Sequence, residues 1–359
     1  MYLFFRLIVM GLIVSLFESV YPQQKVAHIY IDLASLSSLA QMVDVVEQPL
    51  NNPKLLIWKR FHALSIDDPL LKHINAKMPD AKFLGEFNYM LFSDLVDKNV
   101  SDFYQNYSDY VYDIHLNLAH IPRSGRIFDI IPPSQIRSIH LYEDAIGRSL
   151  WDKRTIDEYN SIETSAPKYL HVGFWDPNTF ASIRDKIIKI DFQEKALSLS
   201  ALQKEMIARM TGLDLAQLSA LKRPTILFAD DPSLDLKRTE EFFKSISQKK
   251  ELKSYLWLYK NHPRVARGEG IALKFIKKYF NKVYILPNEI PIEVLILCGY
   301  EPSYIAGYGS SLFFSFKSNQ ILAYIERNYL EMYLKPLLDL GILTKDKIFH
   351  VNQDVEKNN

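Results

Sequence analysis

Four short segments of the chain hold side chains that can move a proton or bind an anion. A carboxylate such as Glu143 or Asp144 can take a proton from a hydroxyl group, and a neutral imidazole offers one hydrogen-bond donor and one acceptor. Glycines let the backbone approach an anion closely, and a helix N-terminus adds partial positive charge. The same residues also fit a structural role, in which two acids solvate a loop and a His-Pro pair makes a turn. The segments are residues 115–120, 141–144, 260–264 and 307–311.

The elements that must position these side chains include two predicted strands. Alternation over residues 111–118 places apolar side chains on one face, with His115 and Asn117 on the other, and residues 136–142 form a second short apolar strand that ends in acids. In both cases the polar cluster lies at the carboxyl end of the strand. Open α/β sheets bind ligands outside the carboxyl ends of their strands, so a site is expected there. We expect His115 itself to be a structural residue with satisfied hydrogen bonds.

The chain contains two α/β series separated by a helical middle. Residues 175–222 have apolar positions at helical spacing and lack strand alternation. At 359 residues the chain is long for one compact core, so two domains are expected, with a break near residues 168–176. No repeat is visible, which disfavours a solenoid or propeller. Further strands are predicted at residues 26–31, 54–58, 225–228, 254–259 and 283–286, and helices at residues 34–46 and 239–247.

Composition excludes some classes of protein. Apolar residues make up 48% of the chain, enough for large cores, and 43 Lys and Arg against 42 Asp and Glu leave almost no net charge. Such a balance does not predict a nucleic-acid partner. The single cysteine, Cys298, cannot form an internal disulfide, and its apolar neighbours predict a buried thiol with a raised pKa rather than a nucleophile.

The first 24 residues differ from the rest of the chain. Arg6 precedes an unbroken apolar run over residues 7–17, which is short for a membrane span of about 20 residues. This pattern favours a secretory signal peptide or an uncleaved membrane anchor over a buried core helix. The protein is therefore expected to be exported or anchored through residues 1–24, with a possible membrane association there.

Seven segments occur in the order typical of the bacterial sialyltransferases of GT-B architecture, and the chain resembles this family. The resemblance implies two Rossmann-like domains that face a deep cleft, formed by residues 25–172 and 173–327, with residues 328–359 crossing back to the first domain. It also implies transfer of a nonulosonic acid from its CMP ester to a sugar hydroxyl with inversion, without a metal or a bound cofactor. The segments are residues 31–36, 58–61, 115–120, 141–144, 260–264, 292–295 and 306–316.

The resemblance assigns the acceptor side of this reaction to the first domain. Asp144 matches the second carboxylate of the family's acidic motif and inherits the role of general base. His120 matches a histidine near the base, which orients Asp144 or binds the acceptor. Arg60 and Asn88 fall where the family contacts the donor sugar or its carboxylate.

The second domain is expected to bind CMP. The segment with Lys260 and His262 resembles the one that holds the CMP phosphate, and a protonated imidazole there can neutralise the departing oxygen. Ser310 and Ser311 resemble the serine pair that binds the same phosphate. Glu293 resembles the acid on the ribose hydroxyls, and a lone carboxylate in an apolar helix supports a ligand or partner for it.

Three departures from the family pattern concern the loops. Ala145 and Asn261 replace motif glycines, and Leu234 stands where the family carries a tryptophan that lines the acceptor site. Loss of that flat aromatic surface should change which acceptor is recognised. The family's acceptor preference is therefore not transferred, and a galactoside or another glycan remains the expected acceptor.

Other functions fit the same residues. One is a transferase that uses CMP-Kdo or another nucleotide sugar. A second is a two-lobed protein that binds a sugar or a nucleotide without reacting it. A third is a degenerate transferase kept for interaction, which Ala145 and Leu234 favour and the presence of Asp144, His262 and Ser310 disfavours.

Overall fold

The structure is a computed structural model, and the predicted signal or anchor, residues 1–24, lies almost wholly outside its described residues. Within the described part of the chain, no helix is both long enough and apolar enough to span a membrane. The described residues are 24–32, 35–48, 52–58, 92–118, 121, 126–143, 153–173, 180–211, 213–221, 224–230, 236–261, 270–286, 293–325 and 331–349.

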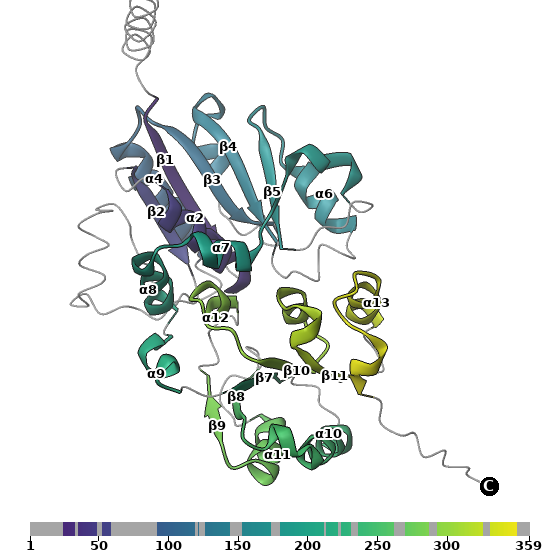
Figure 1. Cartoon of the computed structure of the whole chain (residues 1–359). Helices are drawn as coiled ribbons and strands as arrows, with labels where there is room; N and C mark the ends of the chain where they lie inside the picture. The colour runs from purple at the N-terminus through teal and green to yellow at the C-terminus, as the bar shows by residue number, and fades with distance from the viewer. Residues whose placement is uncertain are drawn as a thin grey trace, which may run out of the picture.

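The first lobe is built on sheet A, six parallel strands in the order β2-β1-β3-β4-β5-β6. The reversal of strand order puts a topological switch point between β1 and β3. In Figure 1 the strands of this sheet run downward, so their carboxyl ends point toward the second lobe. The strands are β1 (Val26–Asp32), β2 (Lys54–Trp58), β3 (Val111–Asn117), β4 (Ile136–Tyr142), β5 (Lys168–Val172) and β6 (Ile187–Lys189).

The two faces of sheet A differ in character. One carries an apolar core, in which residues such as Ile29, Ile114 and Leu141 pack against α4 (Phe92–Asn106), α5 (Ile127–Ile130) and residues of α6 (Lys153–Ser161). The other face lies under α2 (Ser35–Glu47) (Figure 1). It carries buried polar side chains such as His28 and His115. The strand alternation predicted for residues 111–118 is confirmed, because Ile114 and His115 lie on opposite faces.

The second lobe is built on sheet B, also six parallel strands, in the order β12-β11-β10-β7-β8-β9. This is the Rossmann order, with its switch point between β7 and β10. Helices α10 (Leu236–Gln248) and α11 (Ile271–Tyr279) pack on one face around an aromatic core that includes Phe228, Phe243 and Trp257. The strands are β7 (Thr225–Ala229), β8 (Leu256–Lys260), β9 (Val283–Ile285), β10 (Tyr304–Tyr308), β11 (Ile321–Ile325) and β12 (Ile348–Phe349).

Helices of the middle segment connect the lobes, as the sequence predicts. These are α7 (Phe192–Ser198), α8 (Ala201–Met210) and α9 (Leu215–Ala220), which share one apolar core with α2 and with α12 (Glu293–Leu297). Asp191 caps α7 by accepting from two backbone N–H groups, which fixes where the helix begins. From α7, Lys195 Nζ lies 2.6 Å from Glu47 on α2, while Gln193 Nε2 donates to the carbonyl of Ser315, 3.1 Å away.

The predicted two-lobed α/β architecture is confirmed, but the structure corrects two of its boundaries. The predicted domain break after residue 172 is too early, because β6 pairs with β5 and extends sheet A to Lys189. The predicted return of residues 328–359 to the first domain is wrong for residues 348–349, because β12 pairs with β11 of sheet B. Phe349 there packs edge-on against Phe242 of α10, with ring centroids 5.3 Å apart. Helix α13 (Glu331–Asp339) packs against the short helix η6 (Ser311–Ser315) of the same lobe.

Candidate functional site

The carboxyl edge of sheet A carries the polar cluster predicted from the sequence. Register aligns Asn117 of β3 with Tyr142 of β4, and Tyr142 with His171 of β5. Glu143 follows β4 directly and is only 6% exposed. Its Oε1 accepts from the backbone N–H of Gly173 at 2.5 Å, and its own N–H donates to the carbonyl of His171 at 3.3 Å. The first acid of the pair is therefore not a solvated loop residue.

Five of the nine predicted site residues lie outside the described residues, so their roles stay predictions. They are Arg60, Asn88, His120, Asp144 and His262. Asp144 comes directly after Glu143 in the chain, and His262 directly after the described Asn261. The two departures Ala145 and Leu234 also fall outside the described part.

The carboxyl edge of sheet B brings the predicted CMP-side residues toward one place. Gly307 of β10 is in register with Ala229 of β7, so these two flank the switch point, and Ala229 is in register with Lys260 of the next strand, β8. Gly307 has φ near +149°, and a Cβ there would lie 2.6 Å from the carbonyl oxygen of Ala229. Only glycine fits this close approach of two strands. Ser310 follows β10 and caps η6, its Oγ accepting from the N–H of Leu312 at 3.3 Å, and Ser311 begins that helix.

Lys260 and Glu293 interact electrostatically within this edge. Both are buried, at 6% and 5% exposure, and Glu293 is the first residue of α12. Burial raises the pKa of the Glu293 carboxyl, and the positive charge of Lys260 partly opposes this. Lys260 Nζ also donates to the carbonyl of Asn261 at 2.7 Å. The sequence prediction of a buried acid among apolar residues is confirmed.

Asp230, at the end of β7, is a buried site residue that the sequence analysis did not identify. Its carboxylate accepts from the Tyr259 hydroxyl and from the backbone N–H of Ala272 at the start of α11, while its own N–H donates to the carbonyl of Lys260 at 2.9 Å. Burial raises the pKa of Asp230 to about 6, although the Tyr259 bond opposes this. The signal was an acid directly after a buried strand.

Replacing Gly270 by Ala should separate Asp230 from Tyr259. The new Cβ would lie 1.8 Å from the Tyr259 hydroxyl oxygen and 2.3 Å from Asp230 Oδ2, so one of them must move. We expect the free energy of unfolding to fall by about 2–4 kcal/mol, since overpacking and a broken buried hydrogen bond add. Urea denaturation measures this. Gly341→Ala is the control for backbone strain alone, because Gly341 has open space around it but φ +67°, which costs an alanine about 1 kcal/mol. A Gly270→Ala protein as stable as that control contradicts the expectation.

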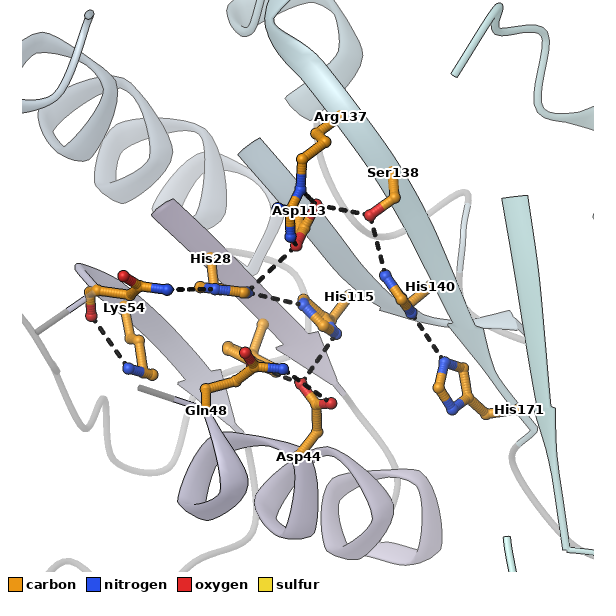
Figure 2. A network of polar contacts seen from close by, with 12 residues as sticks. His28, Asp44, Gln48, Lys54, Asp113, His115, Arg137, Ser138, His140 and His171 are labelled. Atoms are coloured by element: carbon orange, nitrogen blue, oxygen red, sulfur yellow. Dashed lines mark hydrogen bonds and ion pairs between the residues drawn. The ribbon is translucent and has the colours of Figure 1, made fainter. Parts of the chain in front are cut away.

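The polar face of sheet A forms a buried hydrogen-bonded layer, shown in Figure 2. His28 Nδ1 lies 3.4 Å from His115 Nε2, and His115 Nδ1 lies 3.0 Å from the Tyr142 hydroxyl. The Tyr30 hydroxyl donates to Asp44 of α2 at 2.7 Å, and Asp44 is 3.6 Å from His115 Nδ1. The expectation that His115 is a satisfied structural residue is confirmed.

A second branch of this layer runs along the sheet from the amino ends of the strands toward their carboxyl edge (Figure 2). Arg137 binds Asp113 through two nitrogens, and Ser138 Oγ donates to Asp113 Oδ1 at 2.6 Å. Ser138 Oγ lies 3.0 Å from His140 Nε2, and His140 Nδ1 lies 2.9 Å from His171 Nε2. The network therefore ends at the strand whose last residues hold Glu143.

Burial governs the titration of this layer. It lowers the pKa of His28 to about 4, lowers that of His140, and lowers those of His115 and His171 well below the usual range. Burial by itself would raise the pKa of Asp113, but the hydrogen bonds from Arg137 and Ser138 outweigh it and the pKa is lowered. All four imidazoles are thus neutral at pH 7.

Two further expectations concern cysteine and metals. Cys298 is partly buried, and burial raises the pKa of its thiol to about 12, as the sequence predicts. Among the residues that the structure describes, no three His, Cys, Asp or Glu side chains are grouped so that they could hold a metal ion.

Comparison with solved structures identifies the fold as that of GT-B sialyltransferases. The α/β-galactoside α-2,3-sialyltransferase of Photobacterium phosphoreum superposes with a TM-score of 0.66 at 17% identity, over 91% of this chain and 98% of that one. A 2,6-sialyltransferase from a Photobacterium species, solved with CMP and lactose, gives 0.63 at 17% identity, over 90% and 78%. A sialyltransferase from Photobacterium damsela gives 0.64 at 17% identity, over 90% and 81%.

No protein-family model matches the chain, and no curated protein sequence shows significant similarity to it. The similarity in structure therefore establishes the fold. The GT-B resemblance inferred from the seven sequence segments is confirmed at this level.

Proposed function

We propose that the protein is an inverting glycosyltransferase that moves a nonulosonic acid from its CMP ester to a sugar hydroxyl. The observation that carries the proposal is that Lys260, which interacts with Glu293, and Ser310 lie at or just after the carboxyl ends of β8 and β10, the strands on either side of β7 in sheet B. A nucleotide is expected at such a crevice. The GT-B neighbour solved with CMP and lactose supports the same class of donor and acceptor.

In this proposal the second lobe binds CMP. Lys260, Ser310, Ser311 and His262 hold the phosphate, and Glu293 accepts from the ribose hydroxyls. A carboxylate that is 5% exposed is costly unless a partner satisfies it, and ribose hydroxyls are suitable donors. These fixed charges and dipoles stabilise the leaving phosphate without a metal ion or a bound cofactor.

The first lobe is proposed to supply the acceptor chemistry. Asp144 takes the proton of the acceptor hydroxyl as its oxygen bonds to the anomeric carbon, while the bond from that carbon to the CMP phosphate breaks and CMP leaves with the electron pair. His120 orients Asp144 or the acceptor, and Arg60 and Asn88 bind the donor sugar or its carboxylate. Positioning and charge stabilisation are the protein's main contributions.

The test is turnover of a defined donor. Purified protein with CMP-Neu5Ac and a panel of galactosides should give a product heavier by one sialyl residue in mass spectrometry, together with free CMP. Asp144→Ala should lower kcat by about 1,000-fold while CMP still binds, because a base acts only in the transition state. Turnover of CMP-Kdo but not of CMP-Neu5Ac would identify CMP-Kdo as the donor. Binding of CMP without any turnover by the wild-type protein contradicts a transferase.

A further inference from the structure

Glu143 is held by the neighbouring strand on two sides. Its carboxylate accepts from the N–H of Gly173, and its backbone N–H donates to the carbonyl of His171. His171 is the second-last residue of β5 and Gly173 directly follows that strand, so the side chain and the main chain of Glu143 are both bonded to one short piece of backbone. Only 6% of the surface of Glu143 is exposed, so this residue is buried at the carboxyl edge of sheet A.

The strand end that holds Glu143 is itself fixed by the buried polar layer. The His171 ring stacks on Tyr142, with centroids 4.2 Å apart and planes 18° from parallel. His171 Nε2 lies 2.9 Å from His140 Nδ1, and this pair continues through Ser138 to Asp113 (Figure 2). A network of this kind restricts the orientation of each member when every member is bonded.

We propose that Glu143 is a positioning residue, which fixes the carboxyl end of β4 to β5 and thereby places the following residue, Asp144, for its reaction with the acceptor. This inference rests on the proposed function. A base must lie within hydrogen-bond reach of the acceptor hydroxyl, and misplacement by 1 Å can cost about 100-fold in rate. The clamp on Glu143 acts at the peptide bond directly before that base.

The two adjacent acids are proposed to use different chemical properties. Glu143 uses its carboxylate inside the fold, as an acceptor for a backbone N–H, and a glutamine can accept the same bond through its amide oxygen. An alanine cannot. The acceptor capacity of residue 143 is therefore the property that matters, whereas residue 144 must be able to take up a proton.

Three variants and one control test the inference, each assayed for kcat, acceptor KM and CMP affinity. Glu143→Gln should keep kcat within about 3-fold of wild type, since the bond to Gly173 persists, whereas Glu143→Ala should lower kcat about 30- to 100-fold without weakening CMP binding. Asp144→Asn should be nearly inactive. The control is Glu240→Ala, which removes an acid bonded to Lys278 and Tyr279 on the second lobe and should leave kcat unchanged.

The pH profile of kcat distinguishes the outcomes further. The activity of Glu143→Gln should still fall at low pH, as that of the wild type does, because Asp144 still titrates. A Glu143→Gln protein that is as inactive as Asp144→Asn, or that lacks this acidic limb, overturns the inference, as does full activity of Glu143→Ala. If Glu143→Ala does not fold, the rate and profile of Glu143→Gln decide alone. Absence of turnover in the wild-type protein refutes the proposed function instead, so the two failures are distinguishable.

Discussion

Acidification from pH 7.5 to pH 5 should lower the free energy of unfolding by roughly 4 kcal/mol, through the buried imidazoles of sheet A. Burial lowers the pKa of each in the folded state, whereas the unfolded chain titrates near 6.5. The unfolded state therefore binds more protons below pH 6.5, and stability rises with pH across this range. A histidine with a folded pKa near 4, such as His28, contributes about 2 kcal/mol over the interval. The residues are His28, His115, His140 and His171.

Buried acids act in the opposite direction and reduce the net effect. Burial raises the pKa values of Asp44, Asp230 and Glu293, so the folded state keeps their protons to higher pH than the unfolded state does. Asp230 has a folded pKa of about 6, so its offset lies mostly below pH 6. The steepest loss of stability is therefore expected just below pH 6.5, where these acids matter least.

Charged side chains of several neighbouring elements act on the pKa values of the histidines. Lys54 of β2, Arg137 of β4 and Lys195 of α7 oppose protonation, whereas Asp44 of α2 and Asp113 of β3 favour it. Desolvation is the largest cause for each imidazole, so the acids do not restore the usual pKa. The direction of the pH dependence follows from burial itself.

Urea denaturation at several pH values measures this dependence. His140→Gln should reduce the slope below pH 6.5, by at most one proton, which corresponds to about 1.4 kcal/mol per pH unit. Asp109→Asn is the control, since Asp109 is exposed, bonds to Lys25 and has a lowered pKa, so it does not titrate in this range. A wild-type stability that is flat between pH 7 and pH 5.5 contradicts a buried neutral layer.

The sequence predicted best those strands with a clear apolar pattern. The predicted strand at residues 54–58 coincides with β2, and those at residues 26–31, 136–142 and 225–228 lie within one residue of β1, β4 and β7. The strands that were not predicted include β11, which is a continuous apolar run, so a clear pattern was not sufficient in every case. β10 contains Gly307 and was interpreted only as a loop for anion binding, while β6 is three residues long and partly exposed at the edge of sheet A.

The buried polar layer shows what a local pattern cannot predict. The alternation of polar and apolar residues around His28 and His115 correctly separates the two faces of the sheet. The same alternation would occur if the polar face were exposed to solvent, so the pattern does not predict that this face is buried. The cover comes from α2, which is distant in the sequence from His115, and from the apolar core shared by both lobes. Burial of Glu293 was predictable, because an isolated acid stood in an apolar helix. Burial of Asp230 was not, because its partners Tyr259 and Ala272 lie on other elements.

Replacing Lys260 by Met should destabilise the protein by about 3 kcal/mol and weaken CMP binding by about 100-fold. The stability loss follows because Glu293 stays buried without the cation that opposes its raised pKa, and the carbonyl of Asn261 loses its donor. The binding loss follows from the proposed bond between Lys260 and the CMP phosphate, since a charge-assisted hydrogen bond contributes about 1.5–3 kcal/mol. Urea denaturation and calorimetric titration with CMP measure the two effects.

A second substitution separates these causes. Lys260→Met with Glu293→Gln removes both charges, so it should recover about half of the lost stability, because an uncompensated buried charge costs more than a neutral amide. It should not recover CMP affinity, because the phosphate still lacks its cation and the ribose loses a carboxylate acceptor. Lys274→Met, an exposed lysine on α11, is the control and should change neither quantity. Recovery of binding in the double variant would mean that Lys260 serves only to neutralise Glu293, and equal stability of Lys260→Met and wild type would mean that the two charges are not coupled.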